Sequence, residues 1–202
     1  MKLYYTPGAC SLAPHIVLCE LGLPHTLEKV DLAGHRTASG DDFYSINPKG
    51  YVPTLELGEG QRLTEVAAIL QYLAELKPAA GLLPAAGTLE RAHVLEWLTF
   101  ISSEIHKSLG ALFNPAIGGE WKAAVLANVD RRLGFVDKAL SGHDYLCGNQ
   151  FCIADAYLFT IVSWTGFMHI DLAPWPALAA FQQRVAARPA VQQAMQAEGL
   201  LK

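Results

Sequence analysis

One cysteine, Cys10, stands where an apolar segment gives way to a predicted helix, in the stretch YYTPGACSLAPHI (residues 4–16). A disulfide oxidoreductase would carry a second cysteine three residues later, where this chain has Ala13. At the N-terminal end of a helix, unpaired backbone N–H groups and the helix dipole both favour a thiolate. Cys10 could therefore act as a nucleophile, stabilise the thiolate of a bound substrate or form a mixed disulfide. Its structural alternative is a small buried apolar side chain.

A second candidate is the tripeptide YVP at residues 51–53, which follows Asn-Pro-Lys-Gly. A proline that opens a strand here resembles the cis-proline edge of thioredoxin-like folds. In such an edge Val52 would offer its backbone N–H and C=O to an extended peptide. An ordinary edge-strand proline is the alternative.

Glu65 and Val66 stand at the start of a predicted helix, directly after Thr64, which we expect to cap it. A carboxylate at this place can accept an ammonium group, and the backbone N–H groups that follow can bind a carboxylate. Together they would match the α-carbon end of an amino acid. The alternative is a first-turn glutamate that only stabilises the helix.

Four polar residues, Thr99, Ser103, His106 and Lys107, are spaced so that they share one face of a predicted helix. The neighbouring face carries an apolar stripe: Leu98, Ile101, Ile105 and Leu109. A solvated face is the ordinary interpretation of such polar residues. A histidine beside a lysine in a mostly apolar helix raises the alternative that this face lines a cleft.

A metal site is not expected. His143, Cys147 and Cys152 lie in the stretch HDYLCGNQFC, but their spacing matches no standard zinc pattern and a fourth ligand is missing. We expect buried thiols there. Four cysteines in 202 residues also do not indicate a disulfide framework.

The elements that would position these residues change in kind along the chain. Residues 1–80 mix strands and helices in an order that predicts an α/β domain with a small four-stranded sheet. Residues 81–87 form a linker rich in proline, glycine and alanine. Residues 88–202 are predicted to be an all-α domain, with helices at 89–113, 120–141, 153–168 and 177–197, the last broken at Pro189.

Composition excludes several classes of partner. Hydrophobic residues make up 51% of the chain and charged residues 17%, as in a globular protein. A net charge of −4 provides no electrostatic footprint for nucleic acid or for an anionic membrane. We find neither an apolar run of about 20 residues nor the apolar core of a signal peptide, and we expect a cytoplasmic protein.

Along essentially its whole length the chain resembles bacterial glutathione transferases of the Beta class. The resemblance rests on five segments in register: YYTPGACSLAPHI, INPKGYVPTLEL, LTEVAAILQYLA, EWLTFISSEIHK and IADAYLF. It implies a thioredoxin-like N-terminal domain, an all-α C-terminal domain, a homodimer and a role in detoxification, with glutathione as co-substrate and no metal.

The resemblance also implies roles for residues of the first domain. Cys10 would lie next to the glutathione sulfur, and the backbone of Val52 would pair with the cysteinyl unit. Glu65 would face the γ-glutamyl ammonium group, and the N–H of Val66 would face the γ-glutamyl carboxylate. His35 stands where the family often has a lysine that meets the glycine carboxylate, and as a neutral ring it would bind more weakly.

In the second domain, the resemblance brings His106 and Lys107 to the sulfur region. Thr99, Ser103 and Glu104 match positions that contact glutathione. The electrophile pocket would be lined by the largely apolar stretches 109–118 and 163–169.

The expected reaction is attack by the glutathione thiolate on a small hydrophobic electrophile, with Cys10 and His106 as catalytic residues. Through a mixed disulfide Cys10 could add thiol-transferase or peroxidase activity. Tyr5 and Ser11 are alternatives for stabilising the thiolate. The alternative functions are a non-catalytic binding protein of the same fold and a glutathione-dependent dehalogenase.

Overall fold

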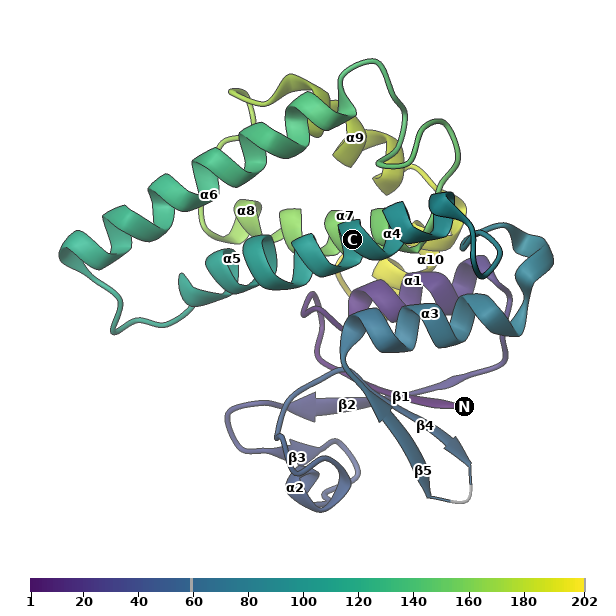
Figure 1. Ribbon diagram of the computed structural model, residues 1–202. Coiled ribbons are helices and arrows are strands. Elements are labelled where there is room, and N and C mark those ends of the chain that lie inside the picture. The colour runs from purple at the N-terminus through teal and green to yellow at the C-terminus, as the bar shows by residue number, and fades with distance from the viewer. Residues whose placement is uncertain (59, 202) are drawn as a thin grey trace. The chain divides into compact units, whose positions relative to one another are not determined.

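The computed structural model describes residues 1–58 and 60–201. The chain forms two compact units, whose elements are labelled in Figure 1. The first unit contains residues 1–80 together with 188–202, and the second contains residues 81–187. The predicted boundary near residue 80 is thus followed by a second one near 188. The predicted helical domain over 88–202 differs from this division, because residues from Arg188 on group with the first unit.

The first unit is built on a mixed sheet with the strand order β3-β2-β1-β4-β5. β1 and β2 are parallel and the other neighbours are antiparallel. The strands are β1 (Lys2–Tyr5), β2 (Thr26–Asp31), β3 (Arg36–Thr37), β4 (Thr54–Gly58) and β5 (Gln61–Thr64). Four strands had been predicted. The fifth, β3, is an edge strand of two residues, too short for its alternation to show in the sequence.

The C-terminal segment from Arg188 on belongs to the first unit because its helix packs against another helix of that unit. They are α1 (Leu12–Glu20), α2 (Phe43–Ile46), α3 (Val66–Leu76), the short 3-10 helix η1 (Pro78–Ala80) and α10 (Pro189–Ala197). α1 and α3 lie along one face of the sheet (Figure 1), and α1 packs against both α3 and α10. Every residue from Leu12 to Leu18 is buried as a result. The run from Leu12 to Leu18 is apolar except for His15, as expected of a helix that is enclosed on several sides.

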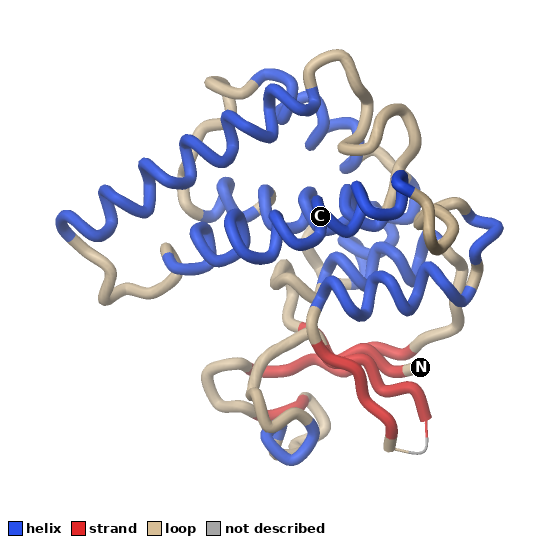
Figure 2. The backbone as a smooth tube through the Cα atoms, viewed as in Figure 1, coloured by secondary structure: helices blue, strands red, loops and turns tan. Residues whose placement is uncertain are grey.

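The second unit is helical throughout, as the colours of Figure 2 show. Its elements are α4 (Leu89–Phe100), the π-helical segment η2 (Ile101–His106), α5 (Lys107–Ala111), α6 (Gly119–Leu140), α7 (Ile153–Val162), α8 (Trp164–Phe167) and α9 (Pro176–Ala186). α7 is buried along its whole length and contacts α4, η2 and α9. In the described part of the chain, no helix combines the length and the apolarity that crossing a bilayer requires.

Candidate functional site

Cys10 lies in the turn between β1 and α1, two residues before the helix begins at Leu12. Its thiol is half-buried and donates a hydrogen bond to the backbone carbonyl of Val52 at 3.3 Å. Two features that the sequence predicted separately are therefore neighbours in the fold. The thiol lies against a backbone group of the kind that binds extended peptides.

The peptide bond between Val52 and Pro53 is cis, which confirms the expectation for this loop. Asn47 supports the loop on both sides of that bond. Its side-chain amide donates to the carbonyl of Tyr51 at 2.8 Å and to the hydroxyl of Thr54 at 3.1 Å. Asn47 was not among the predicted site residues. The available signal was an asparagine in a turn, directly before Pro48, because asparagine side chains in turns often bond to nearby backbone groups.

The helix α3 does not begin as predicted. Thr64 ends β5 instead of capping the helix, and Glu65 takes the N-cap position with a φ of 71°. A positive φ is unfavourable for a residue with a side chain, costing about 1–3 kcal/mol, and such residues are concentrated at functional sites. This backbone conformation marks Glu65 as a candidate independently of its charge. Val66 is the first residue of the helix and is buried.

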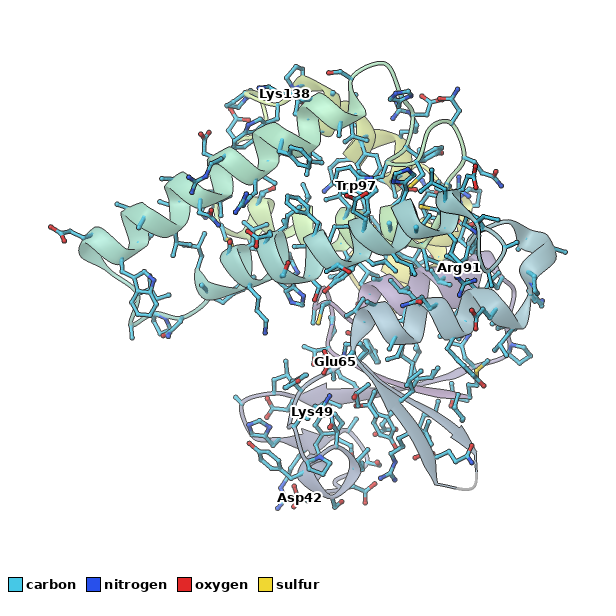
Figure 3. The ribbon with its side chains drawn as sticks, in the orientation of Figure 1. Asp42, Lys49, Glu65, Arg91, Trp97 and Lys138 are labelled. Atoms are coloured by element: carbon cyan, nitrogen blue, oxygen red, sulfur yellow. The ribbon has the colours of Figure 1, made fainter. Side chains whose placement is uncertain are left out.

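The carboxylate of Glu65 is already bound by an ammonium group, that of Lys49, at 2.5 Å (Figure 3). The hydroxyl of Tyr51 donates to the same carboxylate oxygen at 3.1 Å. The hydrogen bond and charge of Glu65 raise the pKa of Lys49 despite some desolvation. Lys49 and Tyr51 were not among the predicted residues. The geometry demonstrates that Glu65 can hold an ammonium group.

His35 lies in the turn that leads into β3 and also has a positive φ, of 49°. Its ring lies against that of Tyr44, with centroids 4.4 Å apart, and its Nε2 is 3.2 Å from the Tyr44 hydroxyl. Nδ1 is buried and has no hydrogen-bond partner among the described residues. Tyr44 therefore orients the imidazole of His35.

In the second unit, Ser103, Glu104 and His106 all lie within the π-helical segment η2. Thr99 lies in the last turn of α4, and Lys107 is the first residue of α5. The predicted continuous helix over 89–113 is therefore interrupted where its polar residues gather. Short π-helical segments inside α-helices are frequent at functional sites because they change the direction in which side chains point.

The polar residues of this segment differ in their partners. The hydroxyls of Thr99 and Ser103 bond to backbone carbonyls four residues earlier, and both side chains are exposed. The carboxylate of Glu104 pairs with Arg132 of α6 at 2.6 Å. Glu104 thus joins η2 to α6 within the unit.

His106 is positioned by aromatic residues. Its Nδ1 lies 2.7 Å from the hydroxyl of Tyr157, which is on α7 and only 1% exposed. Its ring also meets the edge of Trp164, with centroids 5.0 Å apart, and Trp164 in turn contacts Phe113 at 5.2 Å. Trp164 and Phe113 belong to the two stretches predicted to line the electrophile pocket. Tyr157 lies in the motif IADAYLF, and its contact with His106 was not predicted.

The two alternatives to Cys10 have different surroundings. The Ser11 hydroxyl is fully buried and exchanges hydrogen bonds with the backbone of Thr6, at 3.2 and 3.3 Å. Burial raises the pKa of Tyr5, and the charges of Glu198 and Glu28 add to the effect. Ser11 is therefore occupied in shaping the turn, and the Tyr5 phenol is a weaker acid than usual.

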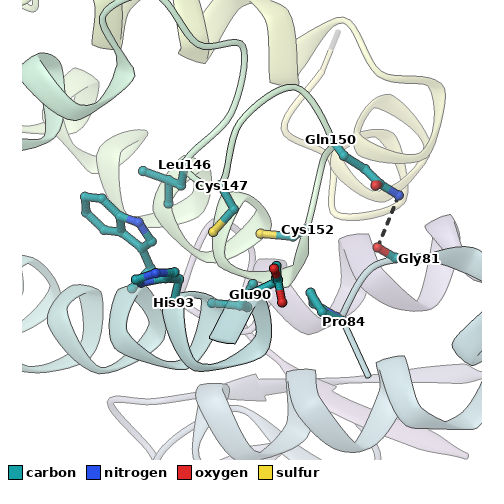
Figure 4. Close-up of a pocket in the computed structure, with 10 residues that line it drawn as sticks. Gly81, Pro84, Glu90, His93, Leu146, Cys147, Gln150 and Cys152 are labelled. Atoms are coloured by element: carbon teal, nitrogen blue, oxygen red, sulfur yellow. Dashed lines mark hydrogen bonds between the residues drawn. The ribbon is translucent and has the colours of Figure 1, made fainter. Parts of the chain in front are cut away.

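A cavity of about 450 Å³ lies in the second unit, between α4 and the segment from Leu146 to Cys152 (Figure 4). It contains none of the residues predicted to bind glutathione. The sulfur atoms of Cys147 and Cys152 face one another in it. A hydrogen bond from Cys152 lowers the pKa of Cys147, and the same bond together with burial raises the pKa of Cys152. The expectation of two buried thiols holds for Cys152, whereas Cys147 is exposed because it lies in a surface turn.

Comparisons with known proteins agree with this architecture. Family models for the N-terminal and C-terminal domains of glutathione S-transferases match residues 8–76 and 100–189. A curated relative, glutathione S-transferase GstA of Escherichia coli O157:H7, is 46% identical over 200 residues, which cover 99% of this chain and 100% of that protein. The solved structure of a sphingomonad glutathione S-transferase complexed with glutathione is 48% identical, with a TM-score of 0.95 over 100% of both chains. A bacterial Beta-class enzyme from Sphingomonas chungbukensis is 46% identical, also with a TM-score of 0.95 over 100% of both chains.

Proposed function

The chain belongs to the glutathione S-transferase family, in its bacterial Beta class, and we propose that it uses Cys10 to activate glutathione for attack on small hydrophobic electrophiles. The thiol of glutathione is mostly protonated at neutral pH, so the task of the enzyme is to favour the thiolate. That thiolate then forms a bond to an electrophilic carbon, from which the leaving group departs with the bonding electrons.

The observation that carries this proposal is the 3.3 Å contact between the Cys10 thiol and the Val52 carbonyl. A cysteinyl unit that pairs with the backbone of Val52 would bring its own sulfur to Cys10 and to the start of α1. There the thiol of Cys10 can donate a hydrogen bond to the glutathione thiolate, and the helix dipole favours its negative charge. Ser11 is less suited to this task because its hydroxyl bonds to Thr6.

Glu65 and Val66 are assigned to the γ-glutamyl end of glutathione. Lys49 shows what the Glu65 carboxylate binds, since its ammonium group is of the same kind as the one on the ligand. The N–H of Val66, at the start of α3, would bind the carboxylate of the same unit. His35, oriented by Tyr44, is assigned to the glycine carboxylate.

Five residues of the helical unit are assigned to the same ligand: Thr99, Ser103, Glu104, His106 and Lys107. Among them His106 is proposed as the polar partner or proton carrier for the sulfur. Its contact with Tyr157 keeps the ring in one orientation, and the neighbouring Trp164 provides an apolar surface for an electrophile. Homodimer formation, a cytoplasmic location and a role in detoxification belong to this proposal as properties that the family implies.

Cys10 can also act through a mixed disulfide. Its thiolate would attack the glutathione sulfur of a mixed disulfide between glutathione and another thiol compound, forming a Cys10–glutathione disulfide while that compound leaves as its thiolate. A second glutathione thiolate would then attack the glutathione sulfur of this intermediate, releasing the Cys10 thiolate and forming glutathione disulfide. This exchange would provide the thiol-transferase side activity.

The test compares conjugation of glutathione to an aryl halide over a range of pH in the wild type, Cys10→Ala, Ser11→Ala and Tyr5→Phe. We expect Cys10→Ala to lose rate near neutral pH and to shift its profile by about one to two pH units to the alkaline side, since the thiolate loses its stabilising partner. Tyr5→Phe should keep the wild-type profile. If the pH profile of Cys10→Ala is unchanged and that of Tyr5→Phe or Ser11→Ala is shifted, the residue whose variant shifts the profile stabilises the glutathione thiolate.

A further inference from the structure

A cluster of metal-ligating side chains lies in the first unit, formed by His15, Cys19 and His25. One coordinating atom from each residue lies within 4.8 Å of those of the other two. His15 and Cys19 are four residues apart on α1 and therefore share a face of that helix. His25 follows the turn that leads from α1 into β2. None of the three residues has a role in the proposed reaction.

Hydrogen bonds fix the proton of each imidazole on Nδ1. The Nδ1 of His25 lies 2.8 Å from the backbone carbonyl of Leu23, which can only accept, so that nitrogen carries the proton. The Nδ1 of His15 lies 2.8 Å from the Glu198 carboxylate, whose other oxygen accepts the backbone N–H of Gly8 at 2.9 Å. An ionised Glu198 accepts from both neighbours. In a neutral ring whose proton is on Nδ1, Nε2 keeps the lone pair that can bind a metal ion.

We propose that His15, Cys19 and His25 form a Zn²⁺ site, with Nε2 of both histidines and Sγ of Cys19 as ligands and a fourth position open to water. Imidazole nitrogen and thiolate sulfur are ligands that zinc prefers, whereas Mg²⁺ and Ca²⁺ prefer oxygen. Binding breaks the S–H bond of Cys19, forms a zinc–sulfur bond and releases one proton to solvent.

The surroundings of the cluster match those of protein zinc sites. Metal-bound histidines usually donate their other N–H to a carboxylate or to a backbone carbonyl, and His15 and His25 provide one example of each. The side chain of Glu198 is fully buried. Its negative charge, together with that of a Cys19 thiolate, would balance the two positive charges of the ion.

The histidine rings are already arranged for a shared ligand. Their centroids lie 5.5 Å apart in an edge-to-face arrangement. His15 is 1% exposed, whereas Cys19 and His25 are partly exposed, so the cluster is anchored in the core and open at its rim. An ion could enter without unfolding the helix. Once bound, it would join α1 to the turn that precedes β2.

The experiment measures Zn²⁺ binding to the metal-free protein, without glutathione, by competition with a chromophoric chelator. Co²⁺ binding is followed in parallel by absorption spectroscopy. Two variants remove ligands, Cys19→Ser and His25→Gln. Two others, Cys10→Ser and Cys147→Ser, remove thiols outside the cluster and serve as matched controls. Thermal melting without metal checks that each variant is folded, which we expect because the two altered ligands are partly exposed.

We expect one Zn²⁺ per chain, and a Co²⁺ complex with a sulfur-to-metal charge-transfer band. Cys19→Ser should abolish that band, and His25→Gln should raise the Kd for Zn²⁺ by at least about tenfold, while both controls bind like the wild type. Mg²⁺ should not compete. Absence of one-to-one binding, or a charge-transfer band that survives in Cys19→Ser and disappears in Cys10→Ser, would overturn the proposal. Because no readout uses glutathione, neither result bears on the transferase activity.

Discussion

The hydroxyl of Tyr157 lies 2.7 Å from Nδ1 of His106, so a fully buried residue of α7 orients the imidazole that we assign to the reaction. Tyr157 is a positioning residue, because it acts through His106. The aromatic contacts of His106 with Tyr157 and Trp164 leave its ring little freedom to rotate. Catalysis would then depend on a side chain that has no assigned contact with glutathione.

The first prediction concerns this hydrogen bond. Tyr157→Phe keeps the ring and removes only the hydroxyl, so we expect kcat/KM for glutathione conjugation to fall by about fivefold, the equivalent of about 1 kcal/mol. The pH profile of the reaction should also change, since His106 loses a partner. Steady-state kinetics over a range of pH measures both effects.

A matched control is available on the same helix. The hydroxyl of Thr160 is buried and bonds to the carbonyl of Ala156 at 2.9 Å, with no part in the His106 contact. Thr160→Val should lower the free energy of unfolding and leave the pH profile unchanged. An identical kinetic loss in both variants would mean that Tyr157 has only a structural role.

The second prediction concerns the Glu65 carboxylate. Glu65→Gln removes the charge that binds Lys49 and, in our assignment, the γ-glutamyl ammonium group. Losing one charge-assisted hydrogen bond should weaken glutathione binding by about 10-fold to 100-fold. Isothermal titration calorimetry measures the Kd directly.

Glu56 offers a control carboxylate in the same unit. It pairs with Lys2 and Arg62 and has no assigned contact with the ligand. Glu56→Gln should leave the Kd for glutathione within about twofold of the wild type. Equal affinity in Glu65→Gln and the wild type would contradict the assignment of Glu65.

The third prediction concerns the reactivity of Cys147. The hydrogen bond from Cys152 lowers its pKa, so the thiolate of Cys147 should form at lower pH than that of an ordinary cysteine. Alkylation by iodoacetamide, followed residue by residue with mass spectrometry, should therefore begin at lower pH for Cys147. Cys19 should react only at higher pH than Cys147, because burial and the charges of Glu20 and Glu198 raise its pKa to about 11.

Two substitutions at position 152 test whether the hydrogen bond from Cys152 causes the lowered pKa of Cys147. Cys152→Ala removes the donor and should move the alkylation midpoint of Cys147 to higher pH. Cys152→Ser keeps an O–H donor and should retain the low midpoint. If both variants behave like the wild type, the hydrogen bond is not the source of the lowered pKa.

The fourth prediction concerns Asp155, whose fully buried carboxylate accepts the backbone N–H groups of Cys152 at 2.8 Å and of Leu146 at 2.9 Å. Asp155→Ala leaves both donors buried without a partner and should reduce the free energy of unfolding by about 3–5 kcal/mol. Urea denaturation measures this change. Asp171, which accepts one backbone N–H at an exposed turn, is the control, and Asp171→Ala should cost less than about 1 kcal/mol.

Local patterns were sufficient to predict much of this fold. Gly22 and Pro24 separate α1 from β2, and Pro189 opens α10 as expected from a proline in the first turn of a helix. The cis bond before Pro53 was one of two interpretations of its loop, and it is the one that the structure has. At the start of α7, Asp155 accepts the backbone N–H of Cys152, three residues earlier. In each case, the residues that determine the helix boundary or the peptide-bond conformation lie within a few positions of it in the sequence.

Features that depend on distant partners could not be predicted in this way. The carboxylate that fixes the tautomer of His15 belongs to Glu198, 183 residues away in sequence. The π-helical turns of η2 carry the same apolar periodicity as an α-helix over so short a span, so the pattern could not reveal them. The positive φ of Glu65 replaced the expected Thr64 cap because the chain passes directly from β5 into α3, without a turn between them.

The grouping of residues 188–202 with the first unit has a consequence for how the chain is made. The ribosome releases α1 early, but the segment that covers it and supplies Glu198 follows more than a hundred residues later. At roughly 5–20 residues per second, that delay is on the order of ten seconds. Until then Gly8 and His15 lack their buried acceptor, and one side of α1 has no covering helix. The unit whose synthesis begins first is the last to be completed.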